Sequence, residues 1–470
     1  MLHQDQGCPR ASGVNHQVLK ESINWLLSGI CLSAIQFRDD CRWTARGLIA
    51  VALLWAWSDE STLVGRFIAA VKIFQRGPGR RRKLPSSYQA FTKILRKWTG
   101  KLRLAVMAAL QERMQQDLSE RFTLFGFAVF GVDGSRLELP RTASNETRYS
   151  PRGKKMSRKG KRRRRGRSRG RAGRDNKKVN CPQMWLTTMW HAGTGLPWDW
   201  RTGPSGSSER EHMLQMIDRL PPEALLTADA GFVGYDYWKT LLDSDREFVI
   251  RVGSNVRLLK KLGRARHGNG LVYLWPANAA KRNLPPLVLR LVVLKTGRHP
   301  VYVVTSVLDP KRLSDKQVAE IYRRRWGIEV YYRHFEQGFG RRKLRSKSAD
   351  NAQIEADWSL LGLWAMCLYA QCQLAEQEVQ AERISVCGVI HAYRSVMRDY
   401  KSRPDPGEDL YSLLDLAVID EYRRTSKASR DYPRKKQEKP PGAPKIYQAT
   451  REQIEKAREI CSQTEIRLTA

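Results

Sequence analysis

Apolar residues recur every three to four positions through most of the first 120 residues, a spacing that predicts amphipathic helices. The pattern is clearest over residues 19–37, 44–57 and 86–118, where basic residues separate the apolar ones. The cations of the third segment are Lys93, Arg96, Lys97, Lys101 and Arg103. They either dock on a DNA backbone or form the solvated face of a helix, and both interpretations fit the pattern.

From residue 122 the pattern changes to runs of β-branched and aromatic residues, which predict strands. Residues 122–133 predict a buried strand that ends at Asp133, and residues 182–203 predict a hairpin. Ser208 and Glu211 form a capping box at the head of a helix, which leads into a second buried strand that ends at Asp229. A further helix and strand follow, so this region is expected to be an α/β domain with a mixed sheet.

The remaining third of the chain returns to a helical pattern after a β-rich insertion at residues 256–310. Helices are expected from a cap at Ser314, and again over 357–375 and 384–400. A Pro- and Lys-rich segment near 426–445 predicts a flexible linker before a last short helix. The chain therefore divides into a helical region at 1–120, the α/β region at 121–375 and a C-terminal region at 376–470.

The net charge of the chain limits the kinds of partner that it is expected to bind. The chain has 84 Lys and Arg against 47 Asp and Glu, a formal net charge of +37. Residues 152–178 alone contain sixteen cations and one acid, yet the excess extends over the rest of the chain. The like charges of a folded protein with this net charge repel one another, so a polyanion, DNA or RNA, is the expected partner. The alternative is a basic protein that is merely soluble.

Several other classes of protein are disfavoured. The eight cysteines show no CxxC pair and no matching histidine spacing, so they are expected to be reduced thiols and not zinc ligands or disulfides. The N-terminus lacks the apolar core of a signal peptide, and the longest apolar run, 47–57, is far shorter than the ~20 residues that span a bilayer. We expect a soluble, cytoplasmic protein that contacts no membrane.

Three carboxylates are candidates for a shared site. Asp133 and Asp229 each follow a buried apolar strand, where ligands gather in α/β sheets, although each alone also fits a turn or cap residue. Glu329 is the best third candidate, because Tyr322, Arg325 and Glu329 are spaced by three and four and share one face of a helix. The alternative is a surface ion-pair ladder.

Converging carboxylates repel one another unless cations lie between them. Ligands that are all oxygen favour Mg²⁺ or Mn²⁺. Two such ions activate an attacking oxygen and stabilise a leaving oxygen at phosphorus. A cationic protein with this cluster therefore indicates phosphodiester chemistry on nucleic acid.

Three segments carry a family resemblance. GVDGSRLELP, TADAGFVGYDYW and YRRRWGIEVYYRHF resemble, in order and spacing, the acidic blocks of DDE transposases from bacterial insertion sequences. The match is best with the insertion-sequence-four group, whose third block has Tyr, Arg, Glu and Lys at positions matched here by Tyr322, Arg325, Glu329 and Glu336. Because Glu336 reverses the expected charge, Arg333 is expected to supply the missing cation.

The resemblance implies a ribonuclease H-like core, with Asp133 on the central first strand and Asp229 at the end of the fourth. It also implies that Asp133, Asp229 and Glu329 hold two Mg²⁺ or Mn²⁺ ions. Tyr322, Arg325 and Arg333 are then expected to contact DNA beside the scissile bond. Trp326 is expected to pack in the core.

The basic run falls in the loop between the first two strands of that core, where a long insertion leaves the sheet undisturbed. We expect this loop to neutralise DNA phosphates through Lys161, Arg162, Arg163, Arg164 and Arg165. The family also implies an aromatic residue in the β insertion that stacks on a base. Trp275 is one candidate for it, although packing is the alternative.

The first functional hypothesis is a Mg²⁺-dependent transposase that cuts double-stranded DNA at element ends and joins it to a target. It is expected to act as a homodimer, with the C-terminal helices as the contact. The second is a nuclease of the same fold that cuts without joining. The third is a catalytically decayed copy that only binds DNA or RNA.

Overall fold

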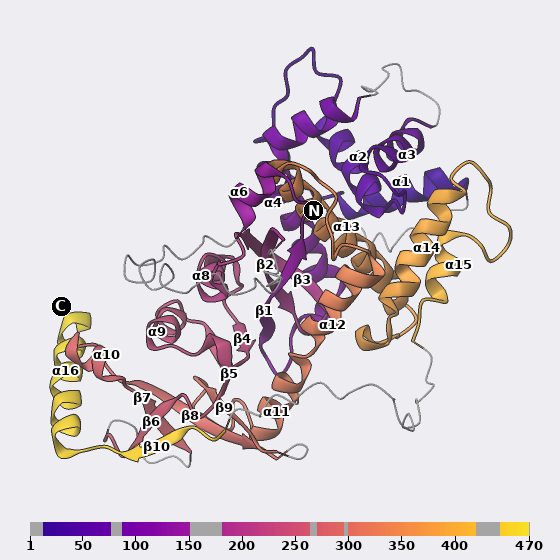
Figure 1. Ribbon diagram of the computed structural model, residues 1–470. Coiled ribbons are helices and arrows are strands. Elements are labelled where there is room, and N and C mark those ends of the chain that lie inside the picture. The colour runs from indigo at the N-terminus through magenta and orange to yellow at the C-terminus, as the bar shows by residue number, and fades with distance from the viewer. Residues whose placement is uncertain are drawn as a thin grey trace, which may run out of the picture.

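The computed structural model describes residues 13–76, 87–150, 181–263, 270–295, 299–419 and 442–469. At its centre the described strands form one ten-stranded sheet in the order β10-β6-β7-β8-β9-β5-β4-β1-β2-β3 (Figure 1). The strands are β1 Ala128–Glu138, β2 Gln183–His191, β3 Leu196–Gly203, β4 Ala224–Ala228, β5 Glu247–Val252, β6 Arg257–Lys260, β7 Leu271–Leu274, β8 Leu287–Leu294, β9 Val301–Thr305 and β10 Lys445–Gln448.

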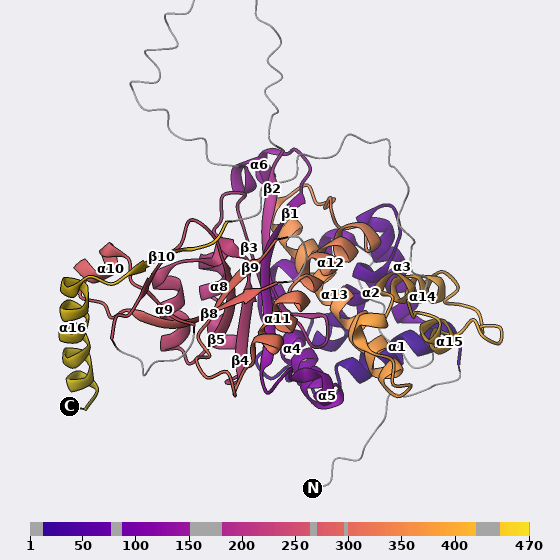
Figure 2. The ribbon, with the colours of Figure 1, turned by 90° about the horizontal axis from the view of Figure 1, so that it is seen from below.

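Helices cover both faces of this sheet. They are α1 Asn15–Leu26, α2 Ala45–Trp57, α3 Leu63–Gln75, α4 Tyr88–Asp117, α5 Ser119–Phe122, α6 Ala143–Tyr149, α8 Glu209–Leu214, α9 Tyr235–Asp243, α10 Ala277–Lys281, α11 Asp315–Arg324, α12 Gly327–Arg333, α13 Ala349–Ala375, α14 Val386–Arg398, α15 Leu410–Asp415 and α16 Arg451–Thr469. Helices α8 and α9 lie on one face, and α4, α11, α12 and α13 on the other (Figure 2).

The half of the sheet formed by β3-β2-β1-β4-β5 has the expected ribonuclease H-like arrangement. Strand β1 pairs antiparallel with β2, which pairs antiparallel with β3. On its other side β1 pairs in parallel with β4, and β4 pairs in parallel with β5. The first strand is therefore central, with Asp133 on it, and Asp229 follows the fourth strand.

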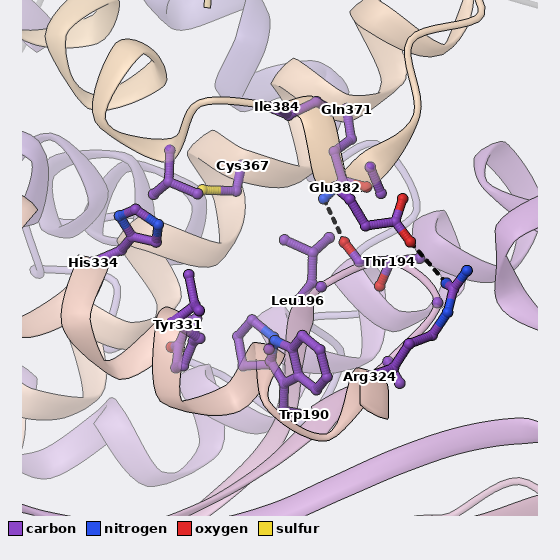
Figure 3. A pocket seen from close by; sticks show the side chains of 18 of the residues that line it. Trp190, Thr194, Leu196, Arg324, Tyr331, His334, Cys367, Gln371, Glu382 and Ile384 are labelled. Carbon is purple, nitrogen blue, oxygen red and sulfur yellow. Dashed lines mark hydrogen bonds and ion pairs between the residues drawn. The ribbon is translucent and has the colours of Figure 1, made fainter. Parts of the chain in front are cut away.

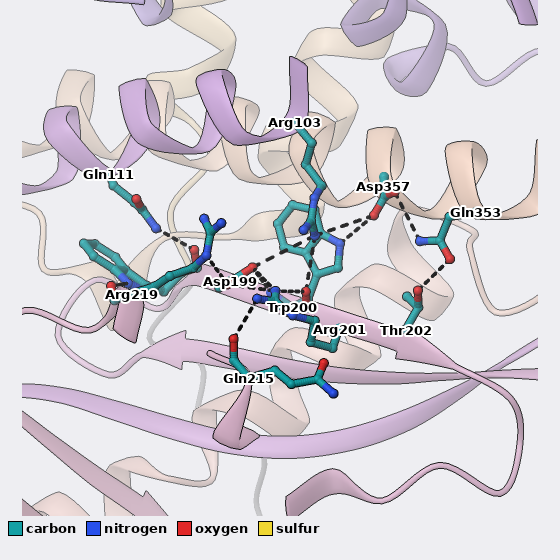
Figure 4. Close-up of polar contacts among 11 residues, drawn as sticks. Arg103, Gln111, Asp199, Trp200, Arg201, Thr202, Gln215, Arg219, Gln353 and Asp357 are labelled. Carbon is teal, nitrogen blue, oxygen red and sulfur yellow. Dashed lines mark hydrogen bonds and ion pairs between the residues drawn. The ribbon is translucent and has the colours of Figure 1, made fainter. Parts of the chain in front are cut away.

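The helical layer joins segments from distant parts of the chain. Helix α13 is buried along nearly its whole length and packs against α2, α4 and β3. A buried polar network connects these elements (Figure 4). Asp199 of β3 is fully buried and lies 2.9 Å from Arg201 and 4.0 Å from Arg103 of α4, while the Trp200 indole donates to Asp357 of α13 at 2.7 Å. Removing one partner would leave a buried charge uncompensated, so the network fixes how the helices sit on the sheet.

This network also decides between the two interpretations of one predicted cation. Arg103 lies over the Trp200 ring at 5.1 Å and is largely buried, so it packs inside the protein and is not a DNA contact in this conformation. The other predicted cations of α4 are exposed: Lys93, Arg96, Lys97 and Lys101.

Some elements differ from the prediction. Strand β1 does not end at Asp133 but continues to Glu138, because its second half pairs with β2. The first helix ends at Leu26, well before residue 37. The β insertion has the predicted strands, yet β9 pairs with β5 and so extends the main sheet. Residues 426–441 of the expected linker lie outside the described residues, and β10 after them pairs with β6.

Cys31, Cys41, Cys181, Cys367 and Cys387 are free thiols. Among the helices that the structure describes, none combines the length and the apolar character that a membrane span needs.

Candidate active site

The pairing register brings Asp133 and Asp229 together. The last parallel pair between β1 and β4 is Gly131 with Thr227, and each aspartate lies two residues further along its strand direction. Asp229 caps the turn after β4, where its Oδ1 accepts a hydrogen bond from the Gly231 amide at 2.7 Å. Asp133 accepts one from the Gly134 amide at 2.8 Å. Both carboxylates therefore lie where β4 ends and β1 runs on without it.

Helix α12 carries Glu329 and is fixed directly on β1. The Tyr332 hydroxyl donates to the Asp133 carbonyl at 2.8 Å and accepts from the Thr188 amide at 3.1 Å. Close approach requires Gly327, since a Cβ there would lie 2.6 Å from Cζ2 of Trp190 on β2. The helix that carries the third acid is thus held in register with the strand that carries the first.

The predicted Tyr, Arg and Glu stripe is present. The helix is interrupted at residues 325–326, between α11 and α12, but Arg325 Nη2 still lies 3.3 Å from Glu329 Oε1. Its guanidinium lies 5.6 Å from the Tyr322 ring centre, and its side chain is 12% exposed. Burial lowers the Arg325 pKa, but the charges of Tyr322, Glu329 and the two aspartates outweigh it and raise that pKa overall.

The charges of the three acids affect one another. Burial is the main cause that raises the pKa of Asp133 to about 6. The Gly134 amide and Arg325 oppose the shift, whereas Asp229 and Glu329 add to it. These interactions support a shared environment for the three predicted acids, with Arg325 among them.

A fourth carboxylate, Glu209, escaped the sequence analysis. It is the first residue of α8, after the Ser208 cap, and packs on Gly134, where an added Cβ would lie 2.9 Å from Glu209 Cδ. Burial, followed by the charges of Asp133 and Asp229, raises the Glu209 pKa to about 7, against the opposing charges of Arg136 and Arg210. Only the strand order would have predicted the position of Glu209. Strand β3 runs parallel to β1, so the helix that follows β3 begins at the same edge of the sheet as Asp133.

The donor set suits a hard divalent cation, because carboxylate oxygens are the ligands that Mg²⁺ and Mn²⁺ prefer. The pKa values of Asp133 and Glu209 are raised first by burial and then by neighbouring carboxylates, whose negative charge a bound cation would offset. Within the described residues, however, no three His, Cys, Asp or Glu side chains approach closely enough to hold one ion. Shared coordination therefore requires side-chain movement from this conformation.

Glu336, at the position where the resembled motif has Lys, has a defined partner. It lies in the π-helical turn His334–Gly338 that follows α12. The Ser135 hydroxyl donates to its carboxylate at 2.5 Å. Ser135 and Asp133 are two residues apart and so project from the same face of β1. Glu336 is therefore held at the border of the candidate site, while Arg333 is exposed at the end of α12.

The two tryptophans differ from the expectations. Trp326 was expected in the core, which is wrong: it is 55% exposed at the start of α12. Trp275 is 6% exposed, and its indole donates to the Leu284 carbonyl at 2.8 Å. Stacking on a base would require that indole to leave its packed position, so the stacking role stays a prediction. Lys161 and Arg162–Arg165 lie outside the described residues.

One cavity of the described part of the chain is separate from these acids. It has a volume of about 300 Å³ and is bordered by Trp190 of β2, Tyr331 of α12 and Cys367 of α13 (Figure 3). An Arg324–Glu382 ion pair closes one side at 2.8 Å. None of the four acids described above lines this cavity, so it lies behind α12 and is not the candidate active site.

The chain is similar to known proteins. The chain is 25% identical over 266 residues to the transposase InsG for insertion sequence element IS4 of Escherichia coli (strain K12), a match that covers 53% of this chain and 58% of that protein's length. A solved piggyBac transposase synaptic complex with hairpin DNA aligns with 88% of this chain and 85% of its own, at 12% identity and a TM-score of 0.38. The family model for the transposase DDE domain matches residues 127–364, about half of the chain and all of the acids above. The chain therefore belongs to the transposase DDE domain family.

Proposed function

We propose that the chain is a transposase that cuts double-stranded DNA at the ends of its element and joins the freed 3′ ends to target DNA. The observation that carries the proposal is the pairing register, by which Asp133 and Asp229 follow the last pair of β1 and β4, at the edge near Glu329 of α12 and its ion-pair partner Arg325. The similarity to the transposase for insertion sequence element IS4 supports the same activity.

Asp133, Asp229 and Glu329 are proposed to hold two Mg²⁺ or Mn²⁺ ions. Bound there, the ions would supply Lewis-acid activation of the attacking oxygen and stabilisation of the leaving oxygen. The protein contributes the rigid placement of the acids through β1, β4 and α12. Arg325, buried beside Glu329, is positioned to bind a phosphate oxygen, and Tyr322 orients its guanidinium.

The partner is proposed to be duplex DNA, on the basis of the net charge of +37 and the exposed cations of α4. A homodimer is proposed because two element ends must be held together. Helix α13 is buried within the protein, so of the C-terminal elements α14, α15 and α16 remain for such a contact.

The test uses a duplex that carries the inverted repeats flanking the gene, with cleaved and joined products separated on a gel. Asp133→Asn, Asp229→Asn and Glu329→Gln should each abolish both products while DNA binding persists. Asp243→Asn on α9 is the matched control, because Asp243 is 57% exposed and pairs only with Lys239 among the described residues.

The other outcomes are informative. Cleavage without joined product would select a nuclease of this fold. Binding without cleavage by the unaltered chain would indicate a decayed copy. Full activity in Asp133→Asn would refute a catalytic role for the cluster.

A further inference from the structure

A row of exposed cations runs beside the end of β1. Arg342, Lys343, Arg345 and Lys347 are exposed, whereas Leu344 and Ser346 between them are buried. The alternation from Lys343 onward is that of an extended chain, in which every second side chain points to the same side. We call residues 342–347 the basic ridge.

The backbone of the basic ridge is anchored to β1. The Glu138 amide donates to the Arg342 carbonyl, and the Leu344 amide donates to the Glu138 carbonyl, both at 2.9 Å. The ridge thereby forms a short parallel bridge with the last residue of β1.

A second set of bonds anchors its other side. The Glu355 carboxylate of α13 is 1% exposed and accepts from the amides of Arg345 at 3.0 Å and Ser346 at 2.9 Å. The Thr142 hydroxyl donates to the Lys347 carbonyl at 2.7 Å. Because the backbone is fixed on both sides, the cations lose less freedom on binding a partner than they would on a loose loop.

The ridge borders an open groove that begins at the candidate active site. The groove has a volume of about 710 Å³, and its lining residues are Pro140, Arg141, Glu336, Gly340, Arg342, Lys343, Leu344 and Arg345. Glu336 is bonded to Ser135, two residues from Asp133 on the same strand face. The groove extends from Glu336, at the border of the candidate site, to the ridge. From Asp133 to Glu138, where the ridge is anchored, the strand rises by about 17 Å.

Little negative charge offsets the ridge. Arg342 lies 3.8 Å from Glu138, and both side chains are largely exposed, while Arg141 pairs with Glu146. Across the part of the chain that the structure describes, Lys343, Arg345 and Lys347 form no ion pair. An anchored row of unneutralised cations along a groove is suited to a polyanionic backbone.

We propose that the basic ridge binds the phosphate backbone of duplex DNA beside the scissile bond and thereby positions the strand on which the acids act. This inference rests on the proposed function. Outward side chains about 6.6 Å apart reach separate phosphates. Among the residues that the structure describes, those that line the groove include no aromatic side chain, so they offer no stacking platform for single-stranded bases. The ridge also supplies positive charge near Glu336, where the resembled motif has Lys.

The test variant is Lys343→Ala/Arg345→Ala/Lys347→Ala in the full chain, which removes three charges and no buried side chain. Binding to a fluorescein-labelled duplex of arbitrary sequence is measured by anisotropy over a series of KCl concentrations. If the three cations contact phosphates, the slope of log K against log salt becomes shallower by about 2.7. The charge-preserving variant Lys343→Arg/Arg345→Lys/Lys347→Arg should restore most of that slope.

The matched control, Lys316→Ala/Lys401→Ala/Arg403→Ala, removes the same charge from exposed positions outside the groove. An unchanged slope in the ridge variant, or an equal change in this control, would overturn the inference. So would a loss confined to single-stranded DNA or RNA. If the unaltered chain bound no duplex at any salt concentration, the proposed function itself would fail. If the unaltered chain and the ridge variant bound duplex equally tightly, only the role of the ridge would be refuted.

Discussion

Replacing Asp133 with Asn is expected to stabilise the metal-free protein near neutral pH. The carboxyl has a pKa of about 6, against 3.8 for a free aspartate, mainly because burial disfavours its charge. Below about pH 4 it is protonated in the folded and the unfolded chain alike. As the pH rises, the unfolded chain ionises first, and above about pH 6 the fold must accommodate the charge. The wild-type fold therefore loses stability through this window.

The size of the effect follows from the pKa difference. One pKa unit corresponds to about 1.4 kcal/mol, so the shift from 3.8 to about 6 corresponds to at most about 3 kcal/mol of unfolding free energy. Asn keeps the shape of the side chain and an oxygen for the Gly134 amide, but it carries no charge. The gain should be near this limit at about pH 8 and vanish at about pH 3.

Urea unfolding in EDTA, followed by tryptophan fluorescence at both pH values, measures the gain. Added Mg²⁺ should stabilise the wild type more than Asp133→Asn, because the ion offsets the repulsion that Asn has already removed. Asp243→Asn, at an exposed position, should change little at either pH. A variant no more stable than wild type at the higher pH would refute the view that Asp133 lies in a buried acidic cluster.

Three further predictions follow from single contacts. Gly327→Ala should force Trp190 aside and destabilise the fold by about 1–3 kcal/mol, visible as a lower urea midpoint, and an unchanged midpoint would contradict the close packing. Trp275→Ala should lower the free energy of unfolding by about 3–5 kcal/mol, and Trp275→Phe should lower it less, because the Trp275 side chain is buried. A Trp275→Ala protein that is fully stable but defective in DNA binding would instead favour base stacking. Gly134→Ala should displace Glu209. Its Mg²⁺ affinity, measured by calorimetry, should therefore change as much as that of Glu209→Gln. Different affinities in the two variants would show that the contact between Gly134 and Glu209 does not affect metal binding.

The sequence indicates the three candidate acids because each lies in a local pattern: two follow apolar strand segments, and Glu329 lies on a helical stripe with Tyr322 and Arg325. It placed the end of β1 too early. Residues after Asp133 are polar because β1 there has lost its partner β4, while β2 still pairs with it to Glu138. A short window of sequence indicates only which side chains are exposed. It does not distinguish a strand that ends from a strand that continues without one of its neighbours.

Glu209 and the basic ridge were missed for a different reason. Glu209 sits beside Asp133 only because β3 returns parallel to β1, a relation set by strand order across about 75 residues of sequence. The ridge appears in the sequence as ordinary loop cations, and its rigidity comes from Glu138 and Glu355. Trp326 was expected in the core, whereas it lies at the break between α11 and α12 and is exposed.

The outermost strand of the sheet arrives very late in synthesis. Strand β10 is supplied by residues 445–448 and covers β6 at residues 257–260, so during translation that edge stays open until residue 448 has emerged. Open strand edges recruit other chains. A message truncated ahead of Lys445 would thus yield a product whose acidic cluster is intact but whose sheet has an unprotected side, prone to aggregate.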